Sequence, residues 1–262
     1  MKILSLILPL AFAWGGEAQT PEQRLAAMIG PSQMQVVQNY RKAYKTAYTL
    51  PQWNALLKQG RQMEETLSKP LSARYESWNQ KGPQPDFSWV EPLVPGMKVT
   101  YQAEGTVLIM ALDYTAFAKL AARTPEPADD QLVSLLIKAQ GDHASPWPNW
   151  FMRTWDYGGC TQLGTGLHLE ILKELQRQQK TAPFFQAELK RVREDLFRDF
   201  AQIRSFCQPQ AKVLKEVSAL MAVPGLSLAE QKTLKGLQTE LKTSKKAEYN
   251  CLKEMSNCRF GQ

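Results

Sequence analysis

The chain has 262 residues, and its 32 Lys and Arg side chains outnumber its 25 Asp and Glu side chains, which gives a net charge of +7. This length is enough for one large domain or for two small ones that share an interface. No apolar run approaches the ~20 residues that a membrane-spanning helix needs, which excludes a protein built on transmembrane helices.

The N-terminus has the pattern of a secretory signal peptide. Lys2 is followed by the apolar run Ile3–Ala13 of about eleven residues, and the small residues after it suit cleavage behind Ala18. Ala11 and Ala13 offer an alternative cleavage site. We therefore expect an exported protein, periplasmic or secreted, without a transmembrane segment.

Export leaves the charge balance of the protein unchanged. Residues 1–18 contain one base and one acid, Lys2 and Glu17, so the mature chain keeps a net charge of +7. We expect residues 19–262 to form a single domain, with a possible soft boundary near 141–160. A basic exported protein has envelope polyanions as natural neighbours, whereas nucleic acid is not an expected partner. Because acids and bases alternate along the chain, the excess charge is also typical of solvated helix faces.

The segments before residue 81 have the apolar spacing of helices. Thr20, with Pro21 and Gln23 after it, is a capping pattern that begins a short helix ending near Gly30. Prolines then separate the further helices expected in this part of the chain, which cover residues 31–48, 51–68 and 71–78.

Residues 98–122 hold the most apolar part of the chain. Val107 to Leu112 are six consecutive apolar residues, which would cover every side of a helix. A helix of that kind is buried on all sides, and no alternating strand pattern of convincing length occurs anywhere in the chain. The sequence therefore predicts an all-α fold, an irregular helical bundle around a central buried helix over about 98–122.

Two segments rich in proline or glycine separate the remaining helices. Residues 81–97 predict a long irregular connection. Residues 141–160 also concentrate aromatic side chains, namely Trp147, Trp150, Trp155 and Tyr157. After them, apolar residues spaced three and four apart predict helices over residues 161–180, 184–206, 211–222 and 228–257.

The four cysteines, an even number in a chain expected to be exported, predict two disulfides. Helices 161–180 and 184–206 are joined by a short turn and should be antiparallel, so their outer ends, Cys160 and Cys207, should meet. Their bridge would close a loop of about 46 residues and stabilise a C-terminal half stapled by disulfides. Cys251 would then pair with Cys258, which requires the helix to break between them, since seven residues of helix span ~10 Å. Crossed pairing remains an alternative.

The stretch from Trp155 to His168 is the strongest candidate for a metal or phosphate site. His143 and His168 would have to bind zinc together with Asp142, Asp156 or Glu170, but His168 and Glu170 point apart on a helix. Phosphate-binding glycine patterns are absent. We therefore expect no metal and no cofactor, a hydrogen-bonded structural His168, and glycines that serve a turn and close helix packing.

The sequence leaves two functional classes open. The first is a binding or interaction protein of the cell envelope that recognises a glycan, a polyanion or a protein. Its expected binding residues are Trp147, Trp150, Trp155, Tyr157, His143 and His168. The second is a hydrolase of peptidoglycan or another envelope glycan, which needs two carboxyl groups in a sugar-binding cleft. Glu104 would be its general acid, with Asp156 or Asp142 opposite, so whether the protein is an enzyme stays open.

Overall fold

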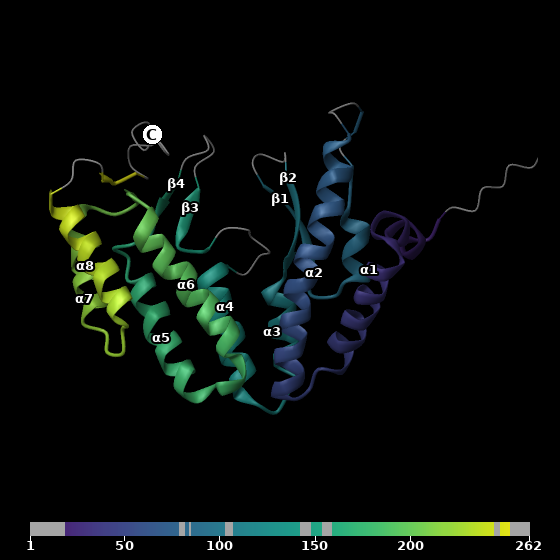
Figure 1. Ribbon diagram of the computed structural model, residues 1–262, viewed down its shortest axis with the longest axis horizontal. Coiled ribbons are helices and arrows are strands. Elements are labelled where there is room, and N and C mark those ends of the chain that lie inside the picture. The colour runs from purple at the N-terminus through teal and green to yellow at the C-terminus, as the bar shows by residue number, and fades with distance from the viewer. Residues whose placement is uncertain are drawn as a thin grey trace, which may run out of the picture.

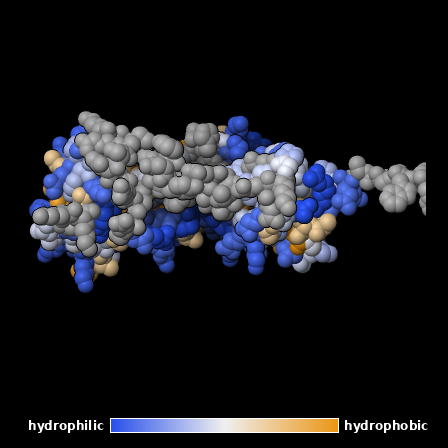
Figure 2. Space-filling view, turned by 90° about the horizontal axis from the view of Figure 1, so that it is seen from above, coloured by the Kyte–Doolittle hydropathy of each residue, from blue (hydrophilic) through white to orange (hydrophobic). Residues whose placement is uncertain are grey.

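The computed structural model describes residues 19–78, 82–83, 85–102, 107–141, 148–153, 159–243 and 247–251. Most of these residues are helical, but two small sheets are also present, so the expectation of an all-α fold holds only approximately. Within the described residues, no helix is long and apolar enough to cross a membrane. Seen from above, the surface of the described residues is mainly hydrophilic, with small hydrophobic patches (Figure 2).

In the first half of the chain, the second of two long helices packs against a β-hairpin and the first packs on the second; this half occupies the right-hand side of Figure 1. Its elements are α1 (Pro21–Thr46), α2 (Leu50–Glu76), the 3-10 helix η1 (Ser88–Leu93), β1 (Met97–Gln102), β2 (Val107–Leu112) and α3 (Tyr114–Ala121).

The second half is a helical layer with a small four-stranded sheet at one end (Figure 1). Its elements are α4 (Pro127–Gln140), β3 (Phe151–Arg153), β4 (Gly159–Thr161), α5 (Leu167–Thr181), the 3-10 helix η3 (Pro183–Phe185), α6 (Gln186–Gln202), β5 (Ser205–Phe206), α7 (Gln210–Met221), α8 (Leu228–Thr243) and β6 (Glu248–Tyr249).

The prediction of a central helix over residues 98–122 is wrong. The apolar run forms β2, which pairs antiparallel with β1 from Met97 opposite Leu112 to Gln102 opposite Val107, and the helix α3 begins only at Tyr114. A run of six apolar residues satisfies a strand that is buried by its neighbours as well as it satisfies a buried helix.

Polar side chains of α2 complete the hydrogen bonding of the hairpin. Three residues one turn apart face the edge of β2 that β1 leaves free: Glu64, Ser68 and Ser72. The Leu112 amide donates to the Glu64 carboxylate at 2.9 Å, and the Met110 amide donates to the Ser68 hydroxyl at 3.0 Å. The Ser72 hydroxyl donates to the Leu108 carbonyl. At the other edge of the hairpin, the Val99 amide donates to the Glu91 carboxylate at 3.1 Å.

Several helix boundaries follow the predicted signals and others do not. Thr20 and Gln23 form the expected capping box, and α1 kinks at Gly30, which has a φ of 81°. However, α2 continues through Pro70, where an interruption was expected, and α8 ends at Thr243 instead of extending toward residue 257.

The predicted disulfide between Cys160 and Cys207 is confirmed, with Cα atoms 5.1 Å apart. Helices α5 and α6 lie side by side and run in opposite directions, as expected (Figure 1). Cys251 is disulfide-bonded as well, whereas Cys258 lies outside the described residues.

The glycines before α5 form a structural joint. Gly164 and Gly166 both have positive φ, and their amides donate to one carboxylate oxygen of Glu216. The other oxygen of Glu216 accepts from the Leu169 amide at 3.0 Å. A buried carboxylate of α7 therefore satisfies the free amides at the N-terminus of α5, a favourable position for a negative charge.

Candidate functional site

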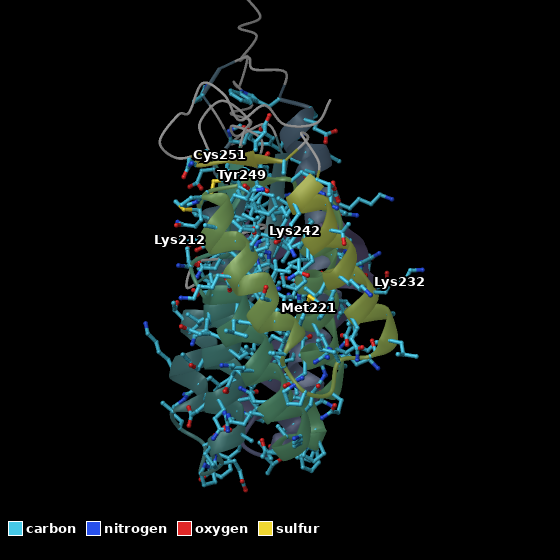
Figure 3. All side chains as sticks on the ribbon, turned by 90° about the vertical axis from the view of Figure 1, so that its left-hand side faces the viewer. Lys212, Met221, Lys232, Lys242, Tyr249 and Cys251 are labelled. Carbon is cyan, nitrogen blue, oxygen red and sulfur yellow. A yellow bond between two sulfur atoms is a disulfide. The ribbon has the colours of Figure 1, made fainter. Side chains whose placement is uncertain are left out.

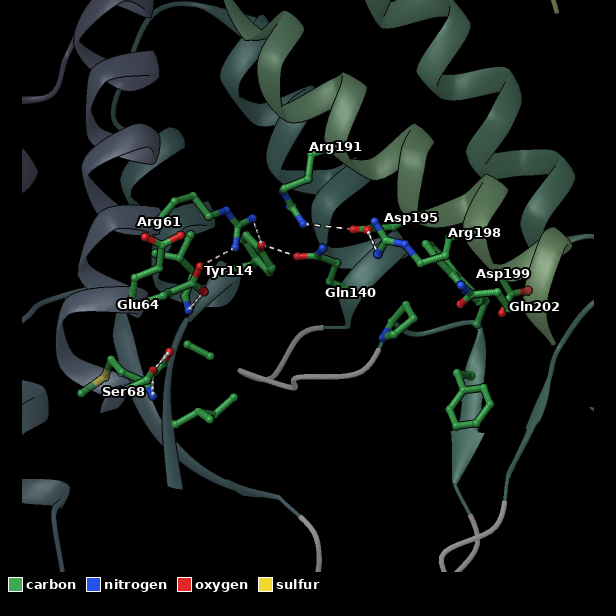
Figure 4. Close-up of a pocket in the computed structure, with 18 of the residues that line it drawn as sticks. Arg61, Glu64, Ser68, Tyr114, Gln140, Arg191, Asp195, Arg198, Asp199 and Gln202 are labelled. Atoms are coloured by element: carbon green, nitrogen blue, oxygen red, sulfur yellow. Dashed lines mark hydrogen bonds and ion pairs between the residues drawn. The ribbon is translucent and has the colours of Figure 1, made fainter. Parts of the chain in front are cut away.

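A cavity of about 670 Å³ lies between the two halves of the molecule. One wall comes from α2 and β2, and the opposite wall comes from α6 and the segment around β3 (Figure 4). Ligand sites occur preferentially in such clefts between structural units. We call this cavity the interlobe cleft.

The base of the interlobe cleft is held by Arg61 of α2. Its guanidinium donates to both carboxylate oxygens of Glu188 in α6, at 3.3 and 3.1 Å, and to Glu64 at 2.9 Å. It also donates to the hydroxyl of Tyr114 at the start of α3. Because these hydrogen bonds occupy the guanidinium and link the two halves, Arg61 is not available to a ligand.

A second arginine continues this network along α6. Arg191 donates to Glu188 at 3.0 Å and to Asp195 at 3.3 Å. The Gln140 amide bridges the two sides: its nitrogen donates to Tyr114 and its oxygen accepts from Arg191 at 2.6 Å. The base of the cleft is therefore a continuous polar network (Figure 4).

The charges in this network determine the protonation of its members. Burial raises the pKa of Glu188, but Arg61 and Arg191 together lower it by more than burial raises it. The pKa of Glu188 therefore lies below its ordinary value. Burial lowers the pKa of Arg61, while Tyr114, Glu188 and Glu64 raise it well above its ordinary value. Burial also raises the pKa of Tyr114. Both ionic partners stay charged at neutral pH.

The far end of the cleft is backed by a buried histidine. His168 Nε2 lies 3.0 Å from Asp199, which lines the cleft, and the Thr161 hydroxyl donates to the same carboxylate oxygen at 2.8 Å. A relay from hydroxyl to histidine to carboxylate needs both ring nitrogens, but Nε2 contacts both groups here, and Nδ1 has no partner among the described residues. The cluster therefore positions Asp199 and is no nucleophilic triad.

Aromatic and aliphatic side chains form the apolar part of the lining. Phe151 is half-buried, while Trp150 is only 1% exposed and packs beside the ring of His168. Ile109 and Ile203 belong to opposite walls. The cleft thus offers an apolar surface next to polar groups.

The structure describes three of the residues that the sequence singled out for binding or catalysis or as possible metal ligands. Trp150 lines the cleft, His168 lies behind it, and Glu170 points to Lys138 on the surface. The others lie outside the described residues: Glu104, Asp142, His143, Trp147, Trp155, Asp156 and Tyr157. Among the described residues, no cluster of His, Cys, Asp and Glu could hold a metal ion.

Sequence reasoning missed the polar and charged residues of the cleft. On α2 they are Arg61, Glu64, Glu65 and Ser68, and on α6 they are Arg191, Asp195, Arg198, Asp199 and Gln202. Each set follows the spacing of three and four that places residues on one helix face, so the signal was present. A polar stripe of this kind also describes any solvated helix face.

Comparison with known proteins does not identify relatives: no protein-family model matches the chain, and no curated protein and no solved structure does so either.

Proposed function

We propose that this protein is an exported binding protein of the cell envelope and that its ligand occupies the interlobe cleft. The observation that carries this proposal is the cavity of about 670 Å³, in which an apolar surface adjoins polar groups from both halves. Concave sites of a few hundred Å³ with this mixture are typical of ligand pockets. The signal-peptide pattern supports export, and the disulfides fit an oxidising compartment.

The lining favours a neutral, hydroxyl-rich ligand over a polyanion. Three arginines line the cleft together with four carboxylates, and the arginines all donate to carboxylates. A polyanion would therefore meet no net positive charge. Carboxylates, guanidinium groups and amides can hydrogen-bond sugar hydroxyls, and Phe151 offers a ring to an apolar sugar face. These features support an envelope glycan as the ligand.

Three polar side chains of the cleft lining are available for such contacts. The side chain of Arg198 is 60% exposed and donates one hydrogen bond, to Asp195 at 2.8 Å. Glu65 and Gln202 are exposed, and their side chains have no hydrogen-bond partner within the described residues. We assign ligand binding to Arg198, Glu65 and Gln202.

Binding can be measured with insoluble peptidoglycan and, by calorimetry, with N-acetylglucosamine oligomers. We expect R198A combined with Q202A to weaken binding about tenfold, since the loss of one or two hydrogen bonds removes roughly 1.4 kcal/mol. The matched control is K190A on the same helix, whose side chain is 75% exposed and does not line the cleft. Equal affinity of the double variant and the control would refute the cleft assignment.

The same incubation tests the hydrolase alternative. That proposal depends on Glu104 with Asp142 or Asp156, so soluble fragments released by the wild type and lost in E104Q would support it. Retention of peptidoglycan without any release supports the binding protein.

A further inference from the structure

The outer face of α7 and α8 carries positive charge that no ion pair neutralises within the described part of the chain. Five exposed lysines lie on these two helices: Lys212, Lys215, Lys232, Lys235 and Lys242. None of them is paired with a carboxylate among the described residues; Lys212 contacts the Gln208 amide. Figure 3 shows this face, with Lys212 and Lys232 extending from its two edges. We call it the lysine face.

The acids of the same two helices are used for other contacts. Glu216 accepts the amides at the start of α5, Glu230 accepts from Arg193 at 2.9 Å, and Glu240 accepts from Arg204 at 2.7 Å. Solvated helix faces usually mix acids with bases, so that charges compensate locally. Glu216 and Glu230 are thus directed to the body of the protein, while Glu240, although held by Arg204, shares a shallow surface hollow with Lys232 and Lys235. Five exposed lysines therefore face one partly exposed acid.

An exposed leucine belongs to the same surface. Leu228, the first residue of α8, is 85% exposed. At 3.6 residues per turn, Leu228, Lys232, Lys235 and Lys242 fall within an arc of about 80° on α8. Lysines next to an exposed leucine are the pattern of a helix that rests on an anionic lipid surface, where the leucine enters the interface and the lysines reach phosphate groups.

We propose that the lysine face of α7 and α8 docks the protein on an anionic phospholipid membrane surface. The interlobe cleft lies between α2 and α6, away from this face (Figure 1), so docking leaves the cleft accessible. A soluble polyanion would use the lysines alone, whereas a membrane also uses Leu228. This proposal does not depend on the identity of the cleft ligand.

The test is co-sedimentation of the purified chain with vesicles of phosphatidylcholine, alone or mixed with phosphatidylglycerol. We expect binding only to the mixed vesicles and release by high salt, because counter-ions screen the exposed lysines. K232A with K235A should weaken binding roughly 25-fold, since each lysine near an anionic surface contributes about a fivefold effect. L228A should weaken it about fivefold.

The matched control is K42A with K45A, two exposed lysines of α1 with the same spacing of three residues. This pair should leave vesicle binding unchanged, and circular dichroism should show that all variants are folded. Lack of binding to the mixed vesicles at low salt would overturn the proposal. Equal binding of the two double variants, or binding to polyphosphate that is unaffected by L228A and without vesicle binding, would overturn it as well.

Discussion

Glu188 illustrates how single residues hold the interlobe cleft together. The residue is only 7% exposed, yet its carboxylate stays ionised because arginines from α2 and α6 surround it. A charge in such a position is tolerated only with partners that replace the water it has lost. Removing the charge would leave the guanidinium groups of Arg61 and Arg191 without their shared acceptor.

We expect E188Q to lower the free energy of unfolding by about 2 kcal/mol at neutral pH. This loss of stability is smaller than the loss on breaking a fully buried ion pair, because the side chains of Arg61 and Arg191 are 23% and 29% exposed. Urea unfolding measures this change in the free energy of unfolding. The control is E194Q, which removes a surface ion pair with Lys190 and should stay within about 0.5 kcal/mol of the wild type.

The same residue makes the effect depend on pH. The pKa of Glu188 is lower in the folded protein than its ordinary value of 4.5, so the stability it contributes is present above that pH and is lost as the pH falls through the folded-state pKa. The difference between E188Q and the wild type should therefore shrink in acid. A difference that stays constant or grows would contradict the role given to this carboxylate.

The pairing of α2 with β2 shows how one element completes another. Side chains at successive turns of α2 supply the partners that a further strand would otherwise provide. Gly60 belongs to the same contact, because a methyl group there would lie 2.7 Å from a Leu112 side-chain carbon. Helix and hairpin therefore depend on each other for their hydrogen bonds and for their close packing.

At this contact we expect S68A to lower the free energy of unfolding by about 1–2 kcal/mol. The substitution leaves the buried Met110 amide without its acceptor at 3.0 Å, and an unsatisfied buried amide is unfavourable by this amount. T66A on the same helix is the control, since its hydroxyl only bonds the Gln62 carbonyl of its own helix. Equal stabilities in a thermal melt would show that the Ser68 contact is unimportant.

The elements that the sequence predicted correctly are those with local signals. Thr20 and Gln23 carry their capping information within four residues, and this capping box forms. The hairpin was missed because β2 is continuously apolar, and because the alternation of apolar and polar residues over the six residues of β1 was overlooked. The contact with α2 that satisfies β2 joins residues about forty positions apart, and no local pattern reports it.

At the scale of the whole molecule, one hydrophobic core joins the two halves. Buried residues of α2 and α3 belong to the same continuous cluster as those of α4, α5 and α6; examples are Leu57, Phe117, Leu136, Leu172 and Leu196. The single domain expected over residues 19–262 remains a prediction. The continuous core explains why the cleft escaped prediction, since its walls come from segments that only the packed core brings together.

We therefore predict one cooperative unfolding transition for the oxidised protein. Hydrogen exchange in increasing urea should show peptides from α1 and from α7 losing protection at the same denaturant concentration, because a shared core couples their unfolding. Separate midpoints for the two helices would show that the halves are independent domains.

The polar caps on both edges of the β-hairpin also bear on how the protein behaves at high concentration. A bare strand edge is a template on which another chain can add, and this is a common start of aggregation. Here Ser68 and its neighbours on α2 occupy one edge, and Glu91 takes an amide on the other. At high concentration, folded copies of this chain would therefore have little opportunity to associate through that hairpin into fibrils.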